Sequence, residues 1–215
     1  MRCRKEDMLL YAVTDRAWVG KLSLYAQVEA ALQNGITCLQ LREKELDAEH
    51  FLEEAKTLAA LCRRYNVPFI VNDNVEIALA CGADGVHVGQ EDQEASAVRQ
   101  KLGPDKILGV SVHSLEEARQ AKAASADYLG LGAVFSTSTK LDVDILPREL
   151  IRQICTECGL PTVAIGGINA GNLLQLSGCG LDGVAVVSAI FAAADPGAAT
   201  AALLPLARRM VKGNE

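Results

Sequence analysis

This chain of 215 residues has no excess of basic residues. It contains 21 Lys and Arg residues and 27 Asp and Glu residues, which gives a formal net charge of −6 at pH 7. A protein that binds nucleic acid regardless of base sequence neutralises phosphates with a basic face. The acidic balance therefore excludes that class. It does not exclude a small anionic substrate, because a few local Arg, Lys or backbone N–H groups are enough to hold one.

A zinc-binding arrangement of cysteines is also missing. The seven cysteines are an odd number and lie scattered at positions 3, 38, 62, 81, 155, 158 and 179. Cys155 and Cys158 form a C-x-x-C, but no second pair or His cluster stands near it, and the apolar residues around it follow helical spacing. We therefore predict free, mostly buried thiols.

Long apolar runs and a leader sequence are absent as well. No run reaches the roughly 18 apolar residues that a membrane-spanning helix requires, and no early segment combines a basic start, an apolar stretch and a small-residue cleavage site. We predict a cytoplasmic protein without a membrane partner. Linkers and low-complexity segments are missing too, so residues 1–215 are expected to form a single domain.

What the chain does contain is an alternation of apolar, β-branched runs with longer segments of helical period, which is the pattern of βα units with parallel strands. The expected strands begin near Met8, Ile36, Pro68, Gly85, Ile107, Tyr128, Pro161 and Gly183. Helical spacing covers 23–34, 47–65, 114–124 and 147–158, a C-terminal helix is expected at about 197–211, and residues 1–7 form a short N-terminal extension.

Eight such units predict an α/β fold that closes into a single (β/α)8 TIM barrel. An open, doubly wound sheet stays an alternative, because periodicity does not reveal closure. Asp47, Ser114 and Asn169 occupy positions where helix N-caps are wanted, and glycines follow several helical segments where left-handed C-caps are wanted. The active site of a TIM barrel lies at the carboxyl ends of its strands, so polar residues there are the candidates for chemistry.

The first such cluster follows the second strand, where Gln40, Arg42 and Lys44 alternate and would project to one side of the strand end. An Arg offers a planar fork to phosphate oxygens, a Lys offers a compact charge, and a Gln can read the edge of a heterocycle. A solvated strand end is the alternative reading of the same alternation.

Carboxylates and hydroxyls follow the next three strands. Asp73 and Asp92 come from adjacent strand ends and could meet at one Mg²⁺ ion, which takes one or two carboxylates and completes its shell with water and phosphate oxygens. The alternative is that each Asp caps the following helix. Ser111 places a hydroxyl at the mouth, and His113 is either a general base or part of a helix start. We expect His87 in the core and His50 at the surface.

Loops after the sixth, seventh and eighth strands carry features of a phosphate site. Four hydroxyls and a cation stand together at 136–140, Gly166 and Gly167 allow close backbone approach, and Ser188 opens a helical turn. A flexible polar loop and tight helix packing are the alternatives. The clusters together indicate one ligand with a diphosphate and another with a monophosphate.

These motifs resemble those of the thiamine phosphate synthase (thiamine-phosphate pyrophosphorylase) family, in the same order, from about Leu10 to Phe191. The matching segments are 40–44, 72–73, 87–92, 109–111, 137–140 and 166–168. Members of that family are TIM-barrel transferases that join 4-amino-5-hydroxymethyl-2-methylpyrimidine diphosphate to a thiazole monophosphate, forming thiamine phosphate and releasing diphosphate. The chain departs from the family at Ser136, where a Pro is common, and at the less typical 141–144.

The resemblance implies a role for each matching residue. The pyrimidine diphosphate would be bound by Gln40, Leu41, Arg42, Glu43, Lys44, Asn72, Ser111 and Lys140, with Gln40 at the ring and Arg42 and Lys44 at the phosphates. Arg42, Lys44, Ser111 and Lys140 would be catalytic, and Asp73 and Asp92 would hold Mg²⁺. The thiazole phosphate would be received by Thr137, Ser138, Thr139, Gly167, Val187 and Ser188.

Two other functions are open at this point. A related thiazole tautomerase would use His113 to move a proton and would need neither the metal nor the pyrimidine diphosphate. A protein that only binds thiamine-type phosphates would release no diphosphate. The intact basic cluster and the two Asp residues favour the synthase. A homo-oligomer is compatible with the sequence, which does not decide the oligomeric state.

Overall fold

The fold is a closed barrel of eight parallel strands in sequential order, as the sequence predicts. The computed structural model describes residues 3–20, 22–90, 94–136 and 144–213. The strands are β1 (Leu10–Val13), β2 (Cys38–Leu41), β3 (Phe69–Asn72), β4 (Gly85–Val88), β5 (Ile107–Val112), β6 (Tyr128–Leu131), β7 (Thr162–Ile165) and β8 (Gly183–Val186). Pairing of β8 with β1, from Leu10 with Val184 to Ala12 with Val186, closes the ring and excludes the open sheet.

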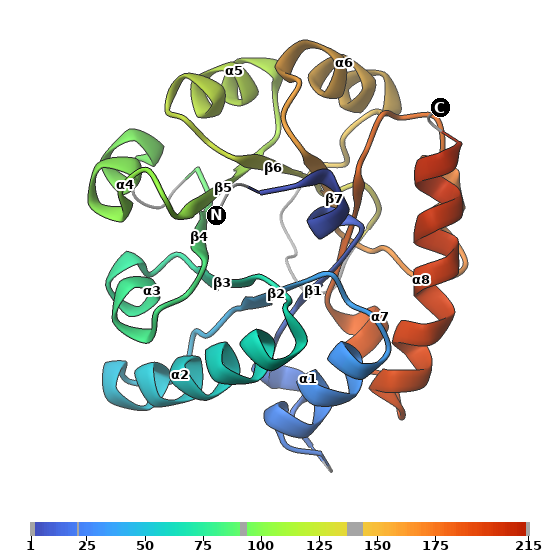
Figure 1. The fold of residues 1–215 in the computed structure, drawn as a ribbon. Coiled ribbons are helices and arrows are strands. Elements are labelled where there is room, and N and C mark those ends of the chain that lie inside the picture. The colour runs from blue at the N-terminus through green and yellow to red at the C-terminus, as the bar shows by residue number, and fades with distance from the viewer. Residues whose placement is uncertain (1–2, 21, 91–93, 137–143, 214–215) are drawn as a thin grey trace.

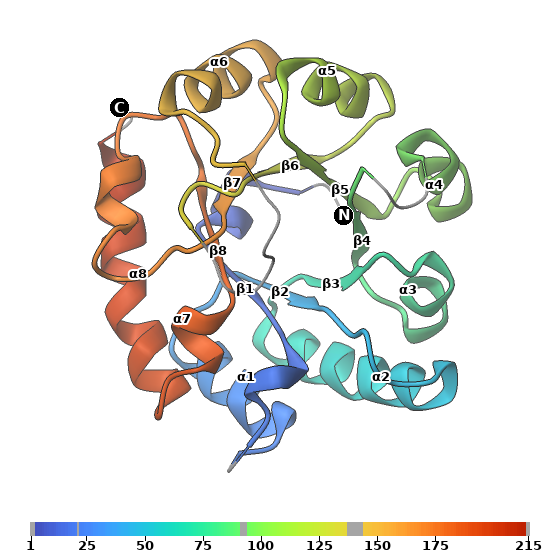
Figure 2. The same ribbon diagram turned by 180° about the vertical axis from the view of Figure 1, so that it is seen from behind.

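A ring of helices surrounds the strands (Figures 1 and 2). The α-helices are α1 (Leu24–Gln33), α2 (Ala48–Tyr65), α3 (Val75–Cys81), α4 (Ala95–Leu102), α5 (Leu115–Ala123), α6 (Arg148–Cys158), α7 (Ser188–Phe191) and α8 (Pro196–Lys212). The 3-10 helices are η1 (Lys5–Met8), η2 (Arg16–Trp18) and η3 (Leu173–Leu176). The side chains of Asp47 and Ser114 accept from the backbone N–H groups of His50 and Glu117, which confirms both N-caps.

The segment between β7 and β8 differs from the prediction. Asn169 was expected to cap a helix, but its Oδ1 accepts from the N–H of Gly171 at 2.8 Å and closes a short turn. η3 then begins after Asn172 and is the helical element described between the two strands. The prediction was wrong because an Asn side chain can satisfy the N–H two residues ahead as readily as it caps a helix.

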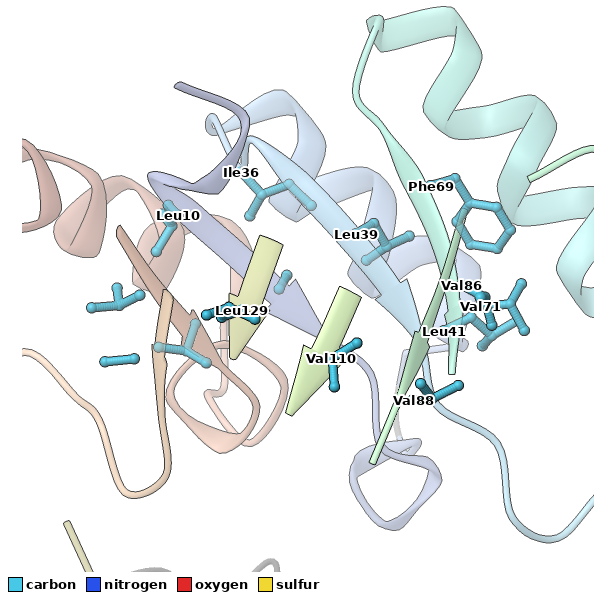
Figure 3. Close-up of a cluster of buried hydrophobic side chains, with 14 of the residues drawn as sticks. Leu10, Ile36, Leu39, Leu41, Phe69, Val71, Val86, Val88, Val110 and Leu129 are labelled. Carbon is cyan, nitrogen blue, oxygen red and sulfur yellow. The ribbon is translucent and has the colours of Figure 1, made fainter. Parts of the chain in front are cut away.

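The larger part of the core lies between the strands and the helices. Strand residues that point outward, such as Leu39, Phe69, Val71 and Val110, pack there with apolar helix residues (Figure 3). The other side of each strand faces the barrel interior, where a second cluster includes Met8, Ile70, Ile107 and Val163. The strands are buried on both faces, which explains their nearly continuous apolar sequence.

The amino-terminal end of the barrel is fixed by a repeated hydrogen bond. The residue directly before each even-numbered strand accepts a hydrogen bond of 2.8–2.9 Å through its side chain. The donor is the backbone N–H of the first or second residue of the odd-numbered strand that comes before it in the sequence. The four pairs are Thr37 with Leu10, Asp84 with Phe69, Asp127 with Leu108, and Asp182 with Thr162. η1 lies across the opening at this end (Figure 1) and buries Met8 inside it.

The cysteines are all free, as predicted, and five of the seven are buried. Cys155 and Cys158 lie on α6 and are not bonded to each other; the thiol of Cys155 contacts Thr162 Oγ1 at 3.4 Å. Burial raises the pKa of Cys155 to about 11, so this thiol stays protonated at neutral pH. No helix among the described residues is long and apolar enough to cross a membrane.

Replacing Asp84 tests the contribution of these side-chain hydrogen bonds at the amino-terminal end of the barrel. We expect Asp84→Ala to lower the free energy of unfolding by about 1–3 kcal/mol, because the buried N–H of Phe69 loses its acceptor. Denaturation with urea measures the change. Glu53→Ala, at an exposed position of α2, is the matched control and should stay within about 0.5 kcal/mol of the unchanged protein. Equal stabilities for the two variants would show that the cap contributes nothing.

Candidate functional site

The predicted basic cluster lies at the carboxyl end of the barrel, beside the polar residues that end β3. Arg42 follows β2 and donates to Asp15 Oδ2 at 3.0 Å, and Lys44 Nζ lies 2.6 Å from Asp73 Oδ2. Asn72 Nδ2 donates to the same Asp73 oxygen at 2.5 Å. Asp73 thus joins the loops after β2 and β3, and it holds this place with a left-handed backbone, φ 61°. Both ion pairs therefore lie at the carboxyl ends of neighbouring strands.

Side chains at this rim differ in how far they are exposed to solvent. Lys44 and Arg42 expose 53% and 32% of their side chains, so an anion can reach both of them. Gln40 is 5% exposed and points into the barrel. Leu41 is fully buried in the outer cluster, between strands and helices. A ligand in the mouth could therefore meet Leu41 through its backbone, while its side chain serves packing.

Glu43 organises the loop that carries the basic residues. Its Oε1 accepts from the N–H groups of Lys44, Glu45 and Leu46, and its Oε2 accepts from Arg16. Burial raises the pKa of Glu43, but the N–H donors and Arg16 outweigh it, so the pKa lies below its usual value. The carboxylate is ionised at neutral pH, and its described contacts are within the protein. Its implied contact with substrate stays a prediction.

A chain of hydrogen bonds crosses the interior beneath the mouth. Gln40 Nε2 donates to the Tyr11 hydroxyl at 2.9 Å, and the Tyr11 and Tyr128 hydroxyls are 2.8 Å apart. His87 Nδ1 lies 2.8 Å from the Tyr128 hydroxyl, and its Nε2 lies 2.8 Å from Ser111 Oγ. The chain therefore connects β2, β1, β6, β4 and β5. His87 is a buried, hydrogen-bonded histidine, as predicted.

Two glycines make room for these rings. A Cβ at Gly109 would lie 2.1 Å from Cζ of Tyr128, and a Cβ at Gly130 would lie 3.2 Å from Cε1 of His87. Burial raises the pKa values of Tyr11 and Tyr128 well above 10, so both phenols stay neutral. The interior thus holds a polar chain, with two neutral phenols in it, inside apolar walls.

The opposite side of the mouth is formed by the ends of β6, β7 and β8. Gly167 has φ 67°, and a Cβ there would lie 2.3 Å from the carbonyl oxygen of Ser136, so the loops after β6 and β7 are in close contact. Val187 packs partly against the interior cluster, and Ser188 is exposed at the start of α7. The close neighbour of the Gly167 backbone is thus another loop, and the approach of a phosphate to this backbone stays a prediction.

Several predicted site residues lie outside the described part of the chain. These are Asp92, Thr137, Ser138, Thr139 and Lys140. Within the described ranges, no three His, Cys, Asp or Glu side chains come together as a metal cluster. Mg²⁺ does not require one, because one or two carboxylates suffice when the substrate supplies phosphate oxygens. The carboxylate of Asp73 at the mouth is a hard oxygen donor of the right kind.

The remaining histidines have local roles. His50 is exposed and bonds Asp47, the N-cap of α2. His113 Nδ1 lies 3.3 Å from Glu117 Oε2, and its backbone N–H donates to the same oxygen at 2.7 Å. This arrangement is the helix start that was the alternative to a general base.

Sequence reasoning missed the partners of the site residues. Asp15 pairs with Arg42, and the hydroxyl of Thr14 accepts the Arg42 N–H at 3.0 Å. Tyr11 and Tyr128 connect the two sides of the interior. A signal for the two tyrosines was available, because each stands among apolar strand residues where its hydroxyl needs a buried partner.

Comparisons of sequence with known proteins show one family. Residues 10–190 match the sequence model of a family described as thiamine monophosphate synthase. The thiamine-phosphate synthase of Ruminiclostridium cellulolyticum is 48% identical over 191 residues, 89% of this chain and 91% of that protein. The enzyme of the same name from Desulfitobacterium hafniense is 46% identical over 203 residues, 94% and 98% of the two chains. The solved thiamine phosphate pyrophosphorylase of Pyrococcus furiosus is 38% identical, with a TM-score of 0.88 and coverage of 96% and 98%.

Removing the charge of Glu43 tests its role in the loop. We expect Glu43→Gln to lower the free energy of unfolding at pH 7 by about 1–3 kcal/mol, because the charge-assisted bond to Arg16 is lost. The pKa of Glu43 is lowered by folding, so its ionised form contributes stability above the unfolded pKa of about 4.5, and this contribution disappears as the pH falls through the lower folded value. Denaturation curves at several pH values should therefore converge in acid. A difference that persists unchanged in acid would contradict this role.

Proposed function

The chain belongs to the thiamine monophosphate synthase family and is a transferase of that kind, and on this premise we propose that it couples 4-amino-5-hydroxymethyl-2-methylpyrimidine diphosphate with a thiazole monophosphate in a Mg²⁺-dependent reaction. The products would be thiamine phosphate and diphosphate. The observation that supports this most directly is that the ion pairs of Arg42 with Asp15 and of Lys44 with Asp73 lie at the carboxyl ends of the strands that also carry Gln40 and Asn72.

The pyrimidine diphosphate would occupy the mouth between β2 and β5. Gln40 and Ser111 would bind its ring edge, since both polar ends of the interior chain lie there. Arg42, Lys44 and, from the loop after β6, Lys140 would bind the diphosphate. The ion pairs of Arg42 with Asp15 and of Lys44 with Asp73 hold the two cations in place, so that phosphate oxygens would meet preorganised donors.

Asp73 and Asp92 would hold Mg²⁺ beside this diphosphate. The donor chemistry of Asp73 fits the ion, since Mg²⁺ prefers carboxylate and phosphate oxygens. When bound, Mg²⁺ would neutralise part of the negative charge on the diphosphate oxygens. Asn72 Nδ2, which donates to Asp73, would orient that carboxylate.

The thiazole phosphate would lie on the other side of the mouth. Thr137, Ser138, Thr139 and Ser188 would offer hydroxyls, and Gly167 and Val187 would offer backbone groups next to the short helix α7. Contact of Gly167 with the carbonyl of Ser136 places the loops after β6 and β7 side by side, as one shared phosphate site requires.

The reaction would need little from the protein beyond positioning and charge. Arg42, Lys44 and Lys140 would stabilise the diphosphate as its oxygen separates from the pyrimidine methylene. The electron-rich aminopyrimidine ring would carry the resulting charge on carbon, and the thiazole nitrogen would then form the new bond. No protein nucleophile takes part, which suits a mouth whose hydroxyls and carboxylates are engaged in binding.

The isomerase alternative receives no support from the described residues. It would need His113 as a mobile proton carrier, whereas His113 is held to Glu117 at the start of α5. The purely binding alternative would show the same site and differ only in turnover. The cytoplasmic location and a homo-oligomeric state stay predictions.

One incubation tests the proposal. Purified protein with both substrates and Mg²⁺ should yield thiamine phosphate and free diphosphate in equal amounts, detected by chromatography and a diphosphate assay. Omission of either substrate, or addition of a chelator of divalent cations, should stop the reaction. Binding of both substrates without release of diphosphate would favour the binding protein over the synthase.

Two substitutions test the charged groups. We expect Asp92→Ala and Lys140→Ala each to lower kcat by about 100-fold or more, because each removes charge stabilisation of the leaving diphosphate. Lys101→Ala is the matched control, since Lys101 forms an exposed ion pair with Glu76 on the outer surface. Unchanged melting temperatures would establish that the fold is intact. Near-normal turnover in both site variants would contradict the assignment.

A further inference from the structure

The interior chain of hydrogen bonds connects two residues that the proposed function places against the same ring. Gln40 begins it on β2 and Ser111 ends it on β5, and Tyr11, Tyr128 and His87 lie between them. The two tyrosines and His87 are buried below the mouth. Each link is 2.8–2.9 Å long, so the chain has no weak member.

One direction of donation along the whole chain is consistent with the first bond. The Nε2 group of Gln40 can only donate, so the Tyr11 oxygen accepts, and a Tyr11 O–H that donates within the chain points to Tyr128. Tyr128 then donates to His87 Nδ1, which is therefore unprotonated. The ring proton sits on Nε2 and is donated to Ser111 Oγ. The Ser111 O–H consequently points away from the chain.

We propose that Tyr11, Tyr128 and His87 are positioning residues that set the hydrogen-bonding polarity of the pyrimidine site. They hold Gln40 with its Oε1 as an acceptor and Ser111 with its O–H as a donor. A ring fits this pair when it offers a donor toward β2 and an acceptor toward β5, as the amino group and ring nitrogen of an aminopyrimidine do. This inference rests on the proposed placement of the pyrimidine.

Burial of the hydrogen-bonded chain favours a single direction of donation along its whole length. A reversal at one link leaves two donors or two acceptors facing each other, which is costly in a buried site where water cannot compensate. The chain therefore reverses only as a whole. The absence of a side chain at Gly109 and Gly130 leaves space for the rings of Tyr128 and His87. The interior cluster of apolar residues surrounds these two rings.

The tautomer of His87 reports the polarity directly. The protein contains three histidines, so labelling with ¹⁵N-histidine gives signals from three imidazole rings that NMR can resolve. The unchanged protein should show His87 with its proton on Nε2. Gln40→Glu, measured at a pH where a ¹³C label shows the new carboxylate to be ionised, replaces the donor by an acceptor. The bonds should then reverse, and Nδ1 should become the proton-bearing nitrogen.

Two further variants separate the chain from a general electrostatic effect. Gln90→Glu adds the same charge near Ser111, whose carbonyl Gln90 contacts at 2.7 Å, but outside the chain, and should leave the tautomer unchanged. Tyr11→Phe combined with Gln40→Glu interrupts the chain, so the new carboxylate no longer sets the direction of the bonds, and His87 should show a mixture of tautomers instead of a proton held on Nδ1. If Gln40→Glu fails to fold, Tyr11→Phe alone should turn the single tautomer into a mixture, because Tyr128 is then free to accept as well as donate.

A kinetic measurement connects the polarity to the substrate. Tyr11→Phe and Tyr128→Phe should raise KM for the pyrimidine diphosphate about three- to tenfold, the value of one hydrogen bond, while KM for the thiazole phosphate stays constant. An Nδ1 that stays unprotonated in ionised Gln40→Glu, or one that gains a proton in Gln90→Glu, overturns the proposal. An unchanged protein that forms no thiamine phosphate would count against the proposed function alone.

Discussion

The pairing of β8 with β1 is the constraint on which the rest of this structure depends. A closed ring of eight short strands brings all carboxyl ends to one rim, so residues distant in the sequence become partners there, Asp15 with Arg42 and Lys44 with Asp73. Closure also encloses a narrow interior that side chains must fill completely. The site at the rim and the hydrogen-bonded chain beneath it are two results of the same geometry.

The interior of this barrel is organised by polarity as well as by volume. Most inward side chains are apolar, and two phenols, an imidazole, an amide and a hydroxyl run through them as one bonded series. Buried polar groups are tolerated when each has a partner, and here the partners come from five different strands. Gln40 and Ser111, at the two ends of the series, are thus supported from below by the buried side chains of Tyr11, Tyr128 and His87.

The sequence was sufficient for the architecture, and it predicts the candidate site at the carboxyl ends of the strands. All eight strands begin within two residues of their predicted positions, because apolar runs covered on both faces are distinct from amphipathic helices. The contact of Lys44 with Asp73 agrees with the rule that the carboxyl ends of neighbouring parallel strands meet at one rim. The pairing of Arg42 with Asp15, the loop-holding role of Glu43 and the bond between two tyrosines 117 residues apart did not follow, because such contacts depend on register and side-chain direction. Asn169 was misread because the same side chain serves a turn and a helix cap equally well.

The four side-chain hydrogen bonds at the amino-terminal end divide the barrel into pairs of strands: β1 with β2, β3 with β4, β5 with β6, and β7 with β8. In each pair, the residue before the even-numbered strand accepts a backbone N–H of the odd-numbered strand. The molecule is in this respect a fourfold repetition of a two-strand module. New chain termini placed between modules, as in a circular permutant opened between α2 and β3, would leave every such bond within one continuous segment. Termini placed inside a module would convert one of these local bonds into a contact between the two ends of the polypeptide.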